Sequence, residues 1–365
     1  MPSTSDDSRW PSLELPLTPP YPPMEAKRTD RIPATGSFQF EPKWDGFRAL
    51  IFRDGNEVAI QSKAGQPLGR YFPEVLEAAR KLKAKKFVLD SELVVPVEGR
   101  LSFDDLLLRI HPAVSRIERL SREIPAQILA FDLLVEPSRG AGGAKLLATL
   151  PIETRRERLE RFFEGIGSDS GFLLTPATMD RDVANEWFEQ WGEAGLDGII
   201  AKRLGEPYHS GDREGMVKVK HFRDADCVVG GFRYSTSGRG SIGALMLGLY
   251  DDAKRLVYVG HCSSFNDKQR KELKALLEPL RGENPFEVRV PGGPSRWASA
   301  ERSTEWEPVQ PKLVCEVRYD YFSQNRFRHG TQFLRWRPDK KPRACTLDQV
   351  DPRATAAKLD EMLKE

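Results

Sequence analysis

A short polar segment at residues 221–226 (His-Phe-Arg-Asp-Ala-Asp) divides the chain into two parts with different sequence patterns. Before it, helix-like and strand-like stretches are mixed, whereas after it the stretches are almost all strand-like. A length of 365 residues fits two domains at roughly 150 residues each. We therefore predict one domain over residues 31–222 and another over 223–365, with a hinge in the polar segment. Residues 1–30 are rich in proline and predict an extended, mostly exposed arm.

The first part predicts an α+β domain with mixed or antiparallel sheets. An Arg-Asp-Gly-Asn turn between two apolar stretches is typical of a β-hairpin. Helical spacing of apolar residues alternates along the chain with dense β-branched runs, which are typical of buried strands. The predicted strands cover residues 47–52, 57–62, 87–97, 128–135, 198–202 and 215–220, and the predicted helices cover residues 71–83, 152–163 and 180–194.

The second part predicts a small all-β barrel of the OB type, because five strands are interrupted by a single helix. The strands are expected at residues 227–234, 244–250, 255–261, 312–319 and 331–337, and the helix at 266–280. Residues 223–365 hold 25 Lys and Arg against 20 Asp and Glu, a balance of +5. In residues 318–343 basic and aromatic side chains are interleaved. That composition suits a surface that follows a phosphate backbone, although a solvated face over a small core has the same composition.

Cysteine usage and hydropathy exclude several classes of protein. The four cysteines lie far apart and form no C-x-x-C pair, which argues against a zinc site or a disulfide framework and favours a reducing cytosol. No apolar run approaches the roughly 20 residues that a membrane-spanning helix needs.

A candidate nucleophile stands in the sequence Glu-Pro-Lys-Trp-Asp-Gly-Phe-Arg at residues 41–48. Lys43 would be nucleophilic only as a neutral amine, which neighbouring cations or a desolvated site can favour. Gly46 would let the backbone approach a ligand closely, and Arg48 could bond a sugar hydroxyl or a phosphate. Taken alone, the same residues also fit a surface turn with one salt bridge.

Further chemistry-bearing elements follow in one order along the chain. They are Ser-Lys-Ala-Gly at residues 62–65, Leu-Asp-Ser-Glu-Leu-Val-Val at 89–95, Ala-Phe-Asp-Leu-Leu at 130–134, Gly-Leu-Asp-Gly-Ile-Ile-Ala-Lys-Arg at 195–203, Met-Val-Lys-Val-Lys at 216–220 and Arg-Trp-Arg-Pro-Asp-Lys at 335–340. This ordered set resembles the covalent nucleotidyltransferases, which are the ATP-dependent DNA ligases, RNA ligases and mRNA capping enzymes. The ending at residues 333–340 is most similar to small bacterial ATP-dependent DNA ligases of the ligase C type.

The resemblance implies a reaction and assigns roles to residues. Lys43 would attack the α-phosphate of ATP to give a lysyl-AMP adduct, and AMP would then pass to the 5′-phosphate of a DNA nick before the 3′-hydroxyl seals the strand. Lys218 and Lys220 alternate on a strand, so both would face the α-phosphate and, as cations, favour a neutral Lys43. The distal motif would orient the departing pyrophosphate, through Arg337, Asp339 and Lys340.

The remaining predicted site residues would bind nucleotide, metal or DNA. Glu92 and Asp197 are the candidate ligands for Mg²⁺, with Mn²⁺ as the alternative ion, although glutamate is more usual than aspartate at position 197 in the family. Phe131 would stack on adenine, and Glu41 would accept from its amino group. Alternatively, Glu92 pairs with a buried cation and Phe131 is ordinary core. The other nucleotide-binding candidates are Arg48, Lys202, Lys218 and Lys220, and the DNA-binding candidates are Lys63, Arg328 and Arg335.

The resemblance thus implies an ATP-dependent DNA ligase that acts on nicked duplex DNA, with end-joining or repair proteins as partners, and we expect a monomer in the cytosol. Three alternatives stay open at this stage: an RNA ligase, a GTP-using capping enzyme, and a nucleic-acid-binding protein without catalysis. The last would have no need for the set Lys43, Arg48, Glu92, Lys218 and Lys220.

Overall fold

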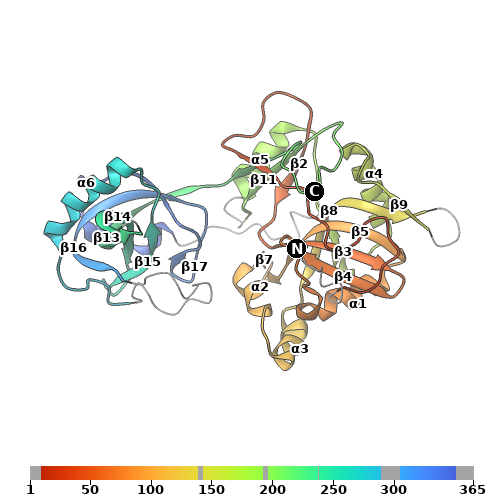
Figure 1. Ribbon diagram of the computed structural model, residues 1–365, viewed down its shortest axis with the longest axis horizontal. Coiled ribbons are helices and arrows are strands. Elements are labelled where there is room, and N and C mark those ends of the chain that lie inside the picture. The colour runs from red at the N-terminus through yellow and green to blue at the C-terminus, as the bar shows by residue number, and fades with distance from the viewer. Residues whose placement is uncertain (1–9, 139–142, 192–195, 237, 289–304, 351–365) are drawn as a thin grey trace, which may run out of the picture. The chain divides into compact units, whose positions relative to one another are not determined.

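The computed structural model describes residues 10–138, 143–191, 196–236, 238–288 and 305–350. The chain divides into two units between His221 and Phe222 (Figure 1). Within the described residues, no helix is both long enough and apolar enough to cross a membrane.

Two sheets form the first unit. One has the strand order β1-β12-β11-β2, from Lys27–Thr29, Met216–Lys220, Gly198–Arg203 and Phe38–Lys43. The other has the order β10-β8-β5-β3-β4, from Phe172–Leu174, Gln127–Pro137, Lys86–Val94, Phe47–Asp54 and Glu57–Ser62, with β9 (Ala144–Leu146) beside β8. Most pairs are antiparallel, while β1–β12 and β10–β8 are parallel, so the predicted mixed sheets are confirmed.

Helices cover the outer faces of these sheets. The core under the larger sheet includes Val75 and Ala79 of α1 (Pro73–Lys81) and Leu159 of α4 (Ile152–Phe163). On the smaller sheet the core includes Ala184 and Trp187 of α5 (Arg181–Trp191). The helices predicted at residues 71–83, 152–163 and 180–194 are these three, although residues 192–195 lie outside the described chain. Sequence periodicity missed the short helices α2 (Phe103–Arg109) and α3 (Val114–Glu123), and a small hairpin joins β6 (Pro96–Val97) to β7 (Arg100–Leu101).

The N-terminal arm is packed against the first unit, so the expectation of a mostly exposed arm is wrong for its described part. From residue 11 to residue 22 partly buried and exposed side chains alternate strictly. The inward side chains join a buried cluster that also holds Met24 and Ala26; they are Trp10, Leu13, Leu15, Leu17 and Tyr21. An extended segment presents every second side chain to one face, and here that face is apolar.

The second unit is the predicted OB barrel. Its strand order is β15-β14-β13-β16-β19, from Leu256–Cys262, Gly238–Tyr250, Arg223–Ser235, Glu307–Tyr319 and Gln332–Trp336. A parallel bridge from Cys262 to Thr331 joins the two edges and closes the barrel. Between β15 and β16 lies α6 (Asp267–Leu277), whose capping box uses Asn266 and Gln269. The barrel also carries the small hairpin of β17 (Phe322–Ser323) and β18 (Arg326–Phe327). All four cysteines are buried in this unit as free thiols.

The hinge predicted at residues 221–226 is too long. Residues 223–226 are already part of β13, where Asp224 pairs with Arg318 and Asp226 with Glu316 of β16. Their polarity comes from side chains that ion-pair across the ladder, for example Arg318 Nε with Asp224 Oδ1 at 3.1 Å. A polar strand with partnered side chains has the composition of a linker, which explains the error.

Candidate active site

Strand register places the basic side chains of the smaller sheet in rows. Lys43 of β2, Gly198 of β11 and Lys220 of β12 are direct neighbours across three strands. Two residues further along these strands, Glu41, Ile200 and Lys218 form the next row on the same face of the sheet. In the larger sheet, Arg48 of β3 is opposite Glu92 of β5.

A cavity between the two sheets brings most of the predicted site residues together. Its lining includes Glu41, Lys43, Arg48, Lys63, Glu92, Phe131, Lys202 and Lys218. The arm supplies a further wall, residues 23–26.

Lys43 is bound to a carboxylate from the loop before β11. Its Nζ donates to Asp197 Oδ2, and Lys220 Nζ lies 3.3 Å from the same oxygen. Burial lowers the pKa of Lys43, but the carboxylates of Asp197, Glu92 and Asp45 outweigh burial and leave that pKa above its ordinary value. The expectation that neighbouring cations keep Lys43 neutral is therefore wrong in this structure. The amine whose pKa is lowered is Lys218, by burial and then by the charges of Lys43, Lys63 and Lys220.

Two glycines allow this arrangement. A Cβ on Gly46 would lie 2.4 Å from the Leu93 carbonyl oxygen and 2.9 Å from Glu92 Cγ. In the structure, the close approach that this glycine allows is to β5. Gly198 has a φ of +143°, and a Cβ there would lie 1.9 Å from the Val219 carbonyl oxygen.

Glu92 is a carboxylate without a direct partner among the described residues. Burial raises its pKa to about 7, although the charges of Lys43 and Arg48 oppose the rise. The alternative prediction, an ion pair with a buried cation, is not found within the described chain. The negative charges of Glu92 and Asp197 both raise the pKa of the Lys43 amine. The described residues contain no group of three or more His, Cys, Asp or Glu side chains that could hold a metal by itself.

A buried network that the sequence did not predict fixes Arg48. Arg48 donates to both carboxylate oxygens of Asp90 at 2.5 Å and to the Met24 carbonyl at 3.2 Å. Tyr208 donates its hydroxyl to Asp90 Oδ2 at 2.5 Å and accepts from Met24 N–H at 2.8 Å. The signal for Asp90 was available, because Asp90 and Glu92 alternate on one strand and face one side.

Phe131, Glu41 and Lys202 form another wall of the cavity. The Phe131 ring lies 4.6 Å from the Arg48 guanidinium carbon and 5.0 Å from Lys202 Nζ. Phe131 belongs to none of the apolar core clusters of the described chain, unlike its buried neighbours Ala130 and Leu133. Lys202 Nζ lies 2.8 Å from Glu41 Oε1 and donates to the Phe131 carbonyl at 2.9 Å. This end of the cavity thus offers an aromatic ring beside a buried ion pair.

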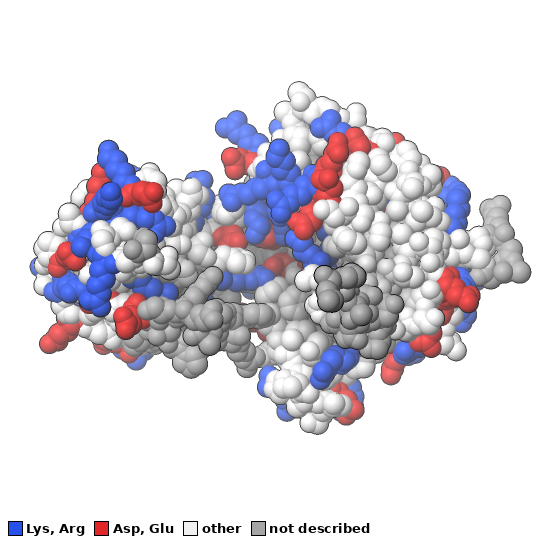
Figure 2. Space-filling view, viewed as in Figure 1, with Lys and Arg blue, Asp and Glu red and all other residues white. Residues whose placement is uncertain are grey.

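The residues predicted to bind DNA belong to different units of the chain. Lys63 lies at the cavity, where its Nζ is 3.2 Å from Glu25 Oε2 of the arm. Arg335 pairs with Glu316 in the second unit, and the Arg328 guanidinium lies 5.5 Å from the centre of the Tyr321 ring. Arg337, Asp339 and Lys340 also belong to the second unit. On the face of that unit shown in Figure 2, basic and acidic side chains are interspersed.

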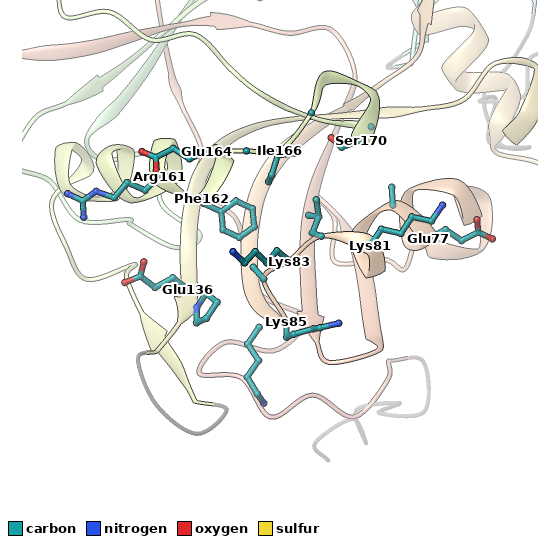
Figure 3. A pocket seen from close by; sticks show the side chains of 18 of the residues that line it. Glu77, Lys81, Lys83, Lys85, Glu136, Arg161, Phe162, Glu164, Ile166 and Ser170 are labelled. Carbon is teal, nitrogen blue, oxygen red and sulfur yellow. The ribbon is translucent and has the colours of Figure 1, made fainter.

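A larger hollow of about 1290 Å³ lies elsewhere on the first unit (Figure 3). Its lining mixes Lys81, Lys83 and Arg161 with Glu136 and Glu164 and contains none of the predicted site residues. The basic and acidic side chains of this hollow largely cancel one another's charge. We therefore take the smaller cavity around Lys43 as the candidate active site.

Comparisons with known proteins match parts of both units of the chain to one family. The family model "ATP dependent DNA ligase domain" matches residues 23–220, and "ATP dependent DNA ligase C terminal region" matches residues 238–340. DNA ligase C1 of Mycolicibacterium smegmatis is 48% identical over 349 residues, which cover 93% of this chain and 96% of that protein. The multifunctional non-homologous end joining protein LigD of Mycobacterium bovis is 29% identical over 307 residues, 83% of this chain but 36% of LigD. A solved structure from a study of Lig E DNA ligases shares the fold, with a TM-score of 0.53, 17% identity, and coverage of 87% of this chain and 99% of that one.

Proposed function

Because this chain belongs to the ATP-dependent DNA ligases, we propose that Lys43 is the residue that carries AMP between ATP and DNA. The Lys43 amine attacks the α-phosphate, the bond to pyrophosphate breaks, and a lysyl-AMP phosphoramidate forms. AMP then moves to the 5′-phosphate at a nick, and attack by the 3′-hydroxyl joins the strands and releases AMP.

The observation that carries the proposal is the cluster around the Lys43 amine. Lys218 and Lys220 come from β12, Asp197 comes from the loop before β11, and Glu92 comes from the facing sheet. Phosphoryl transfer depends mostly on positioning and on neutralising charge, so Lys218 and Lys220 are suited to the α-phosphate oxygens. Arg48 is held in place by Asp90 for the ribose or a phosphate, while Phe131, Glu41 and Lys202 suit the adenine.

A divalent cation fits the carboxylates of this site. Glu92 has no direct partner among the described residues and a raised pKa, so a cation beside it would satisfy a charge that is otherwise costly to bury. Glu92 and Asp197 would hold Mg²⁺ or Mn²⁺, ions that prefer carboxylate oxygens and keep several waters. Such a cation would counter the negative charge that keeps Lys43 protonated and would thereby lower its pKa.

We assign the distal motif and the basic barrel to the leaving group and the DNA. Arg337 and Lys340 supply two cations and Asp339 one carboxylate, which suits a pyrophosphate with its metal ion. Lys63, Arg328 and Arg335 are assigned to DNA phosphates. The likeness to LigD favours a role in joining broken ends as well as nicks, and we propose a monomer that works in the bacterial cytosol with repair proteins.

Incubation of the protein with α-labelled ATP and Mg²⁺ tests the chemistry, followed by a chase with nicked duplex. We expect an acid-labile protein adduct that disappears as AMP-DNA and sealed strand form. Lys43→Ala should give no adduct, and Lys43→Arg should give none either, because a guanidinium stays protonated. Wild-type adduct in Lys43→Ala, or label retained only from GTP, would contradict the proposal.

A further inference from the structure

A buried carboxylate in the second unit binds both cations of the distal motif. Arg337 Nη1 lies 2.9 and 3.1 Å from the two carboxylate oxygens of Asp226, and Lys340 Nζ lies 2.6 Å from Oδ2. The side chain of Asp226 is 10% exposed, against 19% for Arg337 and 28% for Lys340. The carboxylate therefore lies beneath two cations that reach further into solvent.

Asp226 is itself fixed from two directions. Its backbone belongs to β13, in register with Glu316 of β16. In addition, the side-chain amide of Gln349 bonds the Asp226 backbone twice, accepting from its N–H at 2.9 Å and donating to its carbonyl at 3.0 Å. A carboxylate anchored by a strand ladder and by an amide loses little entropy when it holds a long cationic side chain in one position.

Arg337 also binds the carboxylate of Asp339, which is exposed. Asp339 accepts from Arg337 Nε at 3.0 Å and Nη2 at 2.8 Å, but it is two residues away in sequence and 62% exposed. An exposed local ion pair exchanges at small cost, whereas a buried one does not. The guanidinium thus has one edge that is free to exchange its partner for a phosphate oxygen, and one Nη1 group that stays with Asp226.

We propose that Asp226 is a positioning residue for adenylylation: it holds Arg337 and Lys340 so that their remaining N–H groups face the departing pyrophosphate. The inference rests on the proposed function, which assigns these two cations to the leaving group. Asp226 does not touch the nucleotide, and it acts through the orientation of charge that the transition state needs.

The test compares Asp226→Asn with Asp224→Asn in the full-length protein. Asp224 is a carboxylate on the same strand whose partner, Arg318, lies outside the distal motif. In single-turnover adenylylation with labelled ATP, Asp226→Asn should lower the rate at saturating ATP about tenfold, with a smaller change in the ATP concentration for half-maximal rate. Sealing of pre-adenylylated nicks should stay within about twofold of wild type, since no pyrophosphate leaves in that step. Asp224→Asn should match wild type in both steps.

Two further variants separate the possible failures. Full-rate adenylylation by Arg337→Ala would reject the role of the motif in the proposed function. If Arg337→Ala slows adenylylation but Asp226→Asn reacts at the wild-type rate, only the positioning role of Asp226 is wrong. The same conclusion follows if Asp226→Asn loses adenylylation and sealing to the same extent. Asp226→Glu keeps a carboxylate and should recover part of the adenylylation rate. If Asp226→Asn does not fold, the test rests on Asp226→Glu. An equal fall in its rates of adenylylation and of sealing pre-adenylylated nicks would overturn the proposal.

Discussion

At the scale of single residues, the protonation of Lys43 decides whether the site can react. The nucleophile must be a neutral amine, yet the structure holds it beside Asp197, which is the main opponent of burial in setting its pKa. Removing that carboxylate should therefore allow deprotonation at lower pH, even where it slows the reaction for other reasons.

Asp197→Asn should shift the pH dependence of adenylylation. Because the Lys43 pKa is raised in the wild type, the rate should increase as the pH rises toward that pKa. Without the Asp197 charge, burial should lower the Lys43 pKa, so in Asp197→Asn the rate should increase at lower pH. Single-turnover adduct formation from pH 6 to 10 measures both profiles, and identical profiles would contradict the link between the two residues.

Glu92→Gln should change how stability depends on pH. The folded protein raises the Glu92 pKa from 4.5 to about 7, so the native state favours the protonated acid and this group makes the protein less stable as the pH rises between those values. The amide cannot ionise, and Glu92→Gln should be more stable than wild type at pH 8 by about 1–2 kcal/mol, a figure reduced for partial exposure. Urea unfolding at pH 5 and pH 8 checks this, and added Mg²⁺ should stabilise the wild type more than the variant.

The predicted residues that line the cavity stand in sequence motifs, whereas the residues that packing brings to them do not. Lys43, Glu92 and Lys218 stand in short motifs that could be read directly. Tyr208 and Met24 reach the site through long-range hydrogen bonds to Asp90 and Arg48, and no local pattern marks such partners. The charge state of Lys43 also escaped prediction, because it depends on the distance to Asp197, 154 positions away in the chain.

At the scale of elements, the start of β11 sets the distance between Asp197 and Lys43. Asp197 N–H donates to the Lys43 carbonyl at 3.1 Å, and the next residue, Gly198, lies against β12 with a positive φ. Apolar periodicity predicted β11 itself, but it carries no information about how closely two strands approach. For the same reason the close approach of Gly46 to β5 could not be predicted from the sequence.

Gly198→Ala should destabilise the protein by more than the cost of a positive φ at alanine alone. A Cβ would lie 1.9 Å from the Val219 carbonyl oxygen, so the strands must separate, and we expect a loss of about 3 kcal/mol or more in unfolding free energy. Gly205→Ala is the matched control, since Gly205 also has a positive φ (+81°) but a Cβ there meets nothing within 4 Å; its loss should be about 1 kcal/mol. Equal losses in denaturant unfolding would show that contact with Val219 is unimportant.

At the scale of the whole molecule, the two units have separate apolar cores. The buried members of the clusters in the first unit come from residues 24–219, and those of the cluster in the second unit come from residues 225–350. Because none of the clusters in the described chain combines residues of both units, each unit has the material to fold alone. The division near residue 222 was visible in the sequence as a change of pattern, whereas the packed arm was not, since proline-rich composition hid its alternation.

A protein that ends at His221 should separate the two halves of the reaction. It keeps Lys43, Glu92, Asp197, Lys218 and Lys220, and it loses Arg337, Asp339 and Lys340 together with the barrel. If the distal cations orient pyrophosphate, adduct formation from ATP should fall by a hundredfold or more, the scale on which loss of transition-state donors acts. Sealing of pre-adenylylated nicks needs no leaving pyrophosphate and should survive at a reduced rate. That rate should fall steeply with added salt, because fewer phosphate contacts remain to hold the DNA. Adduct formation at the full-length rate would mean that the first unit completes the ATP step alone, and the division of labour between the units would be wrong.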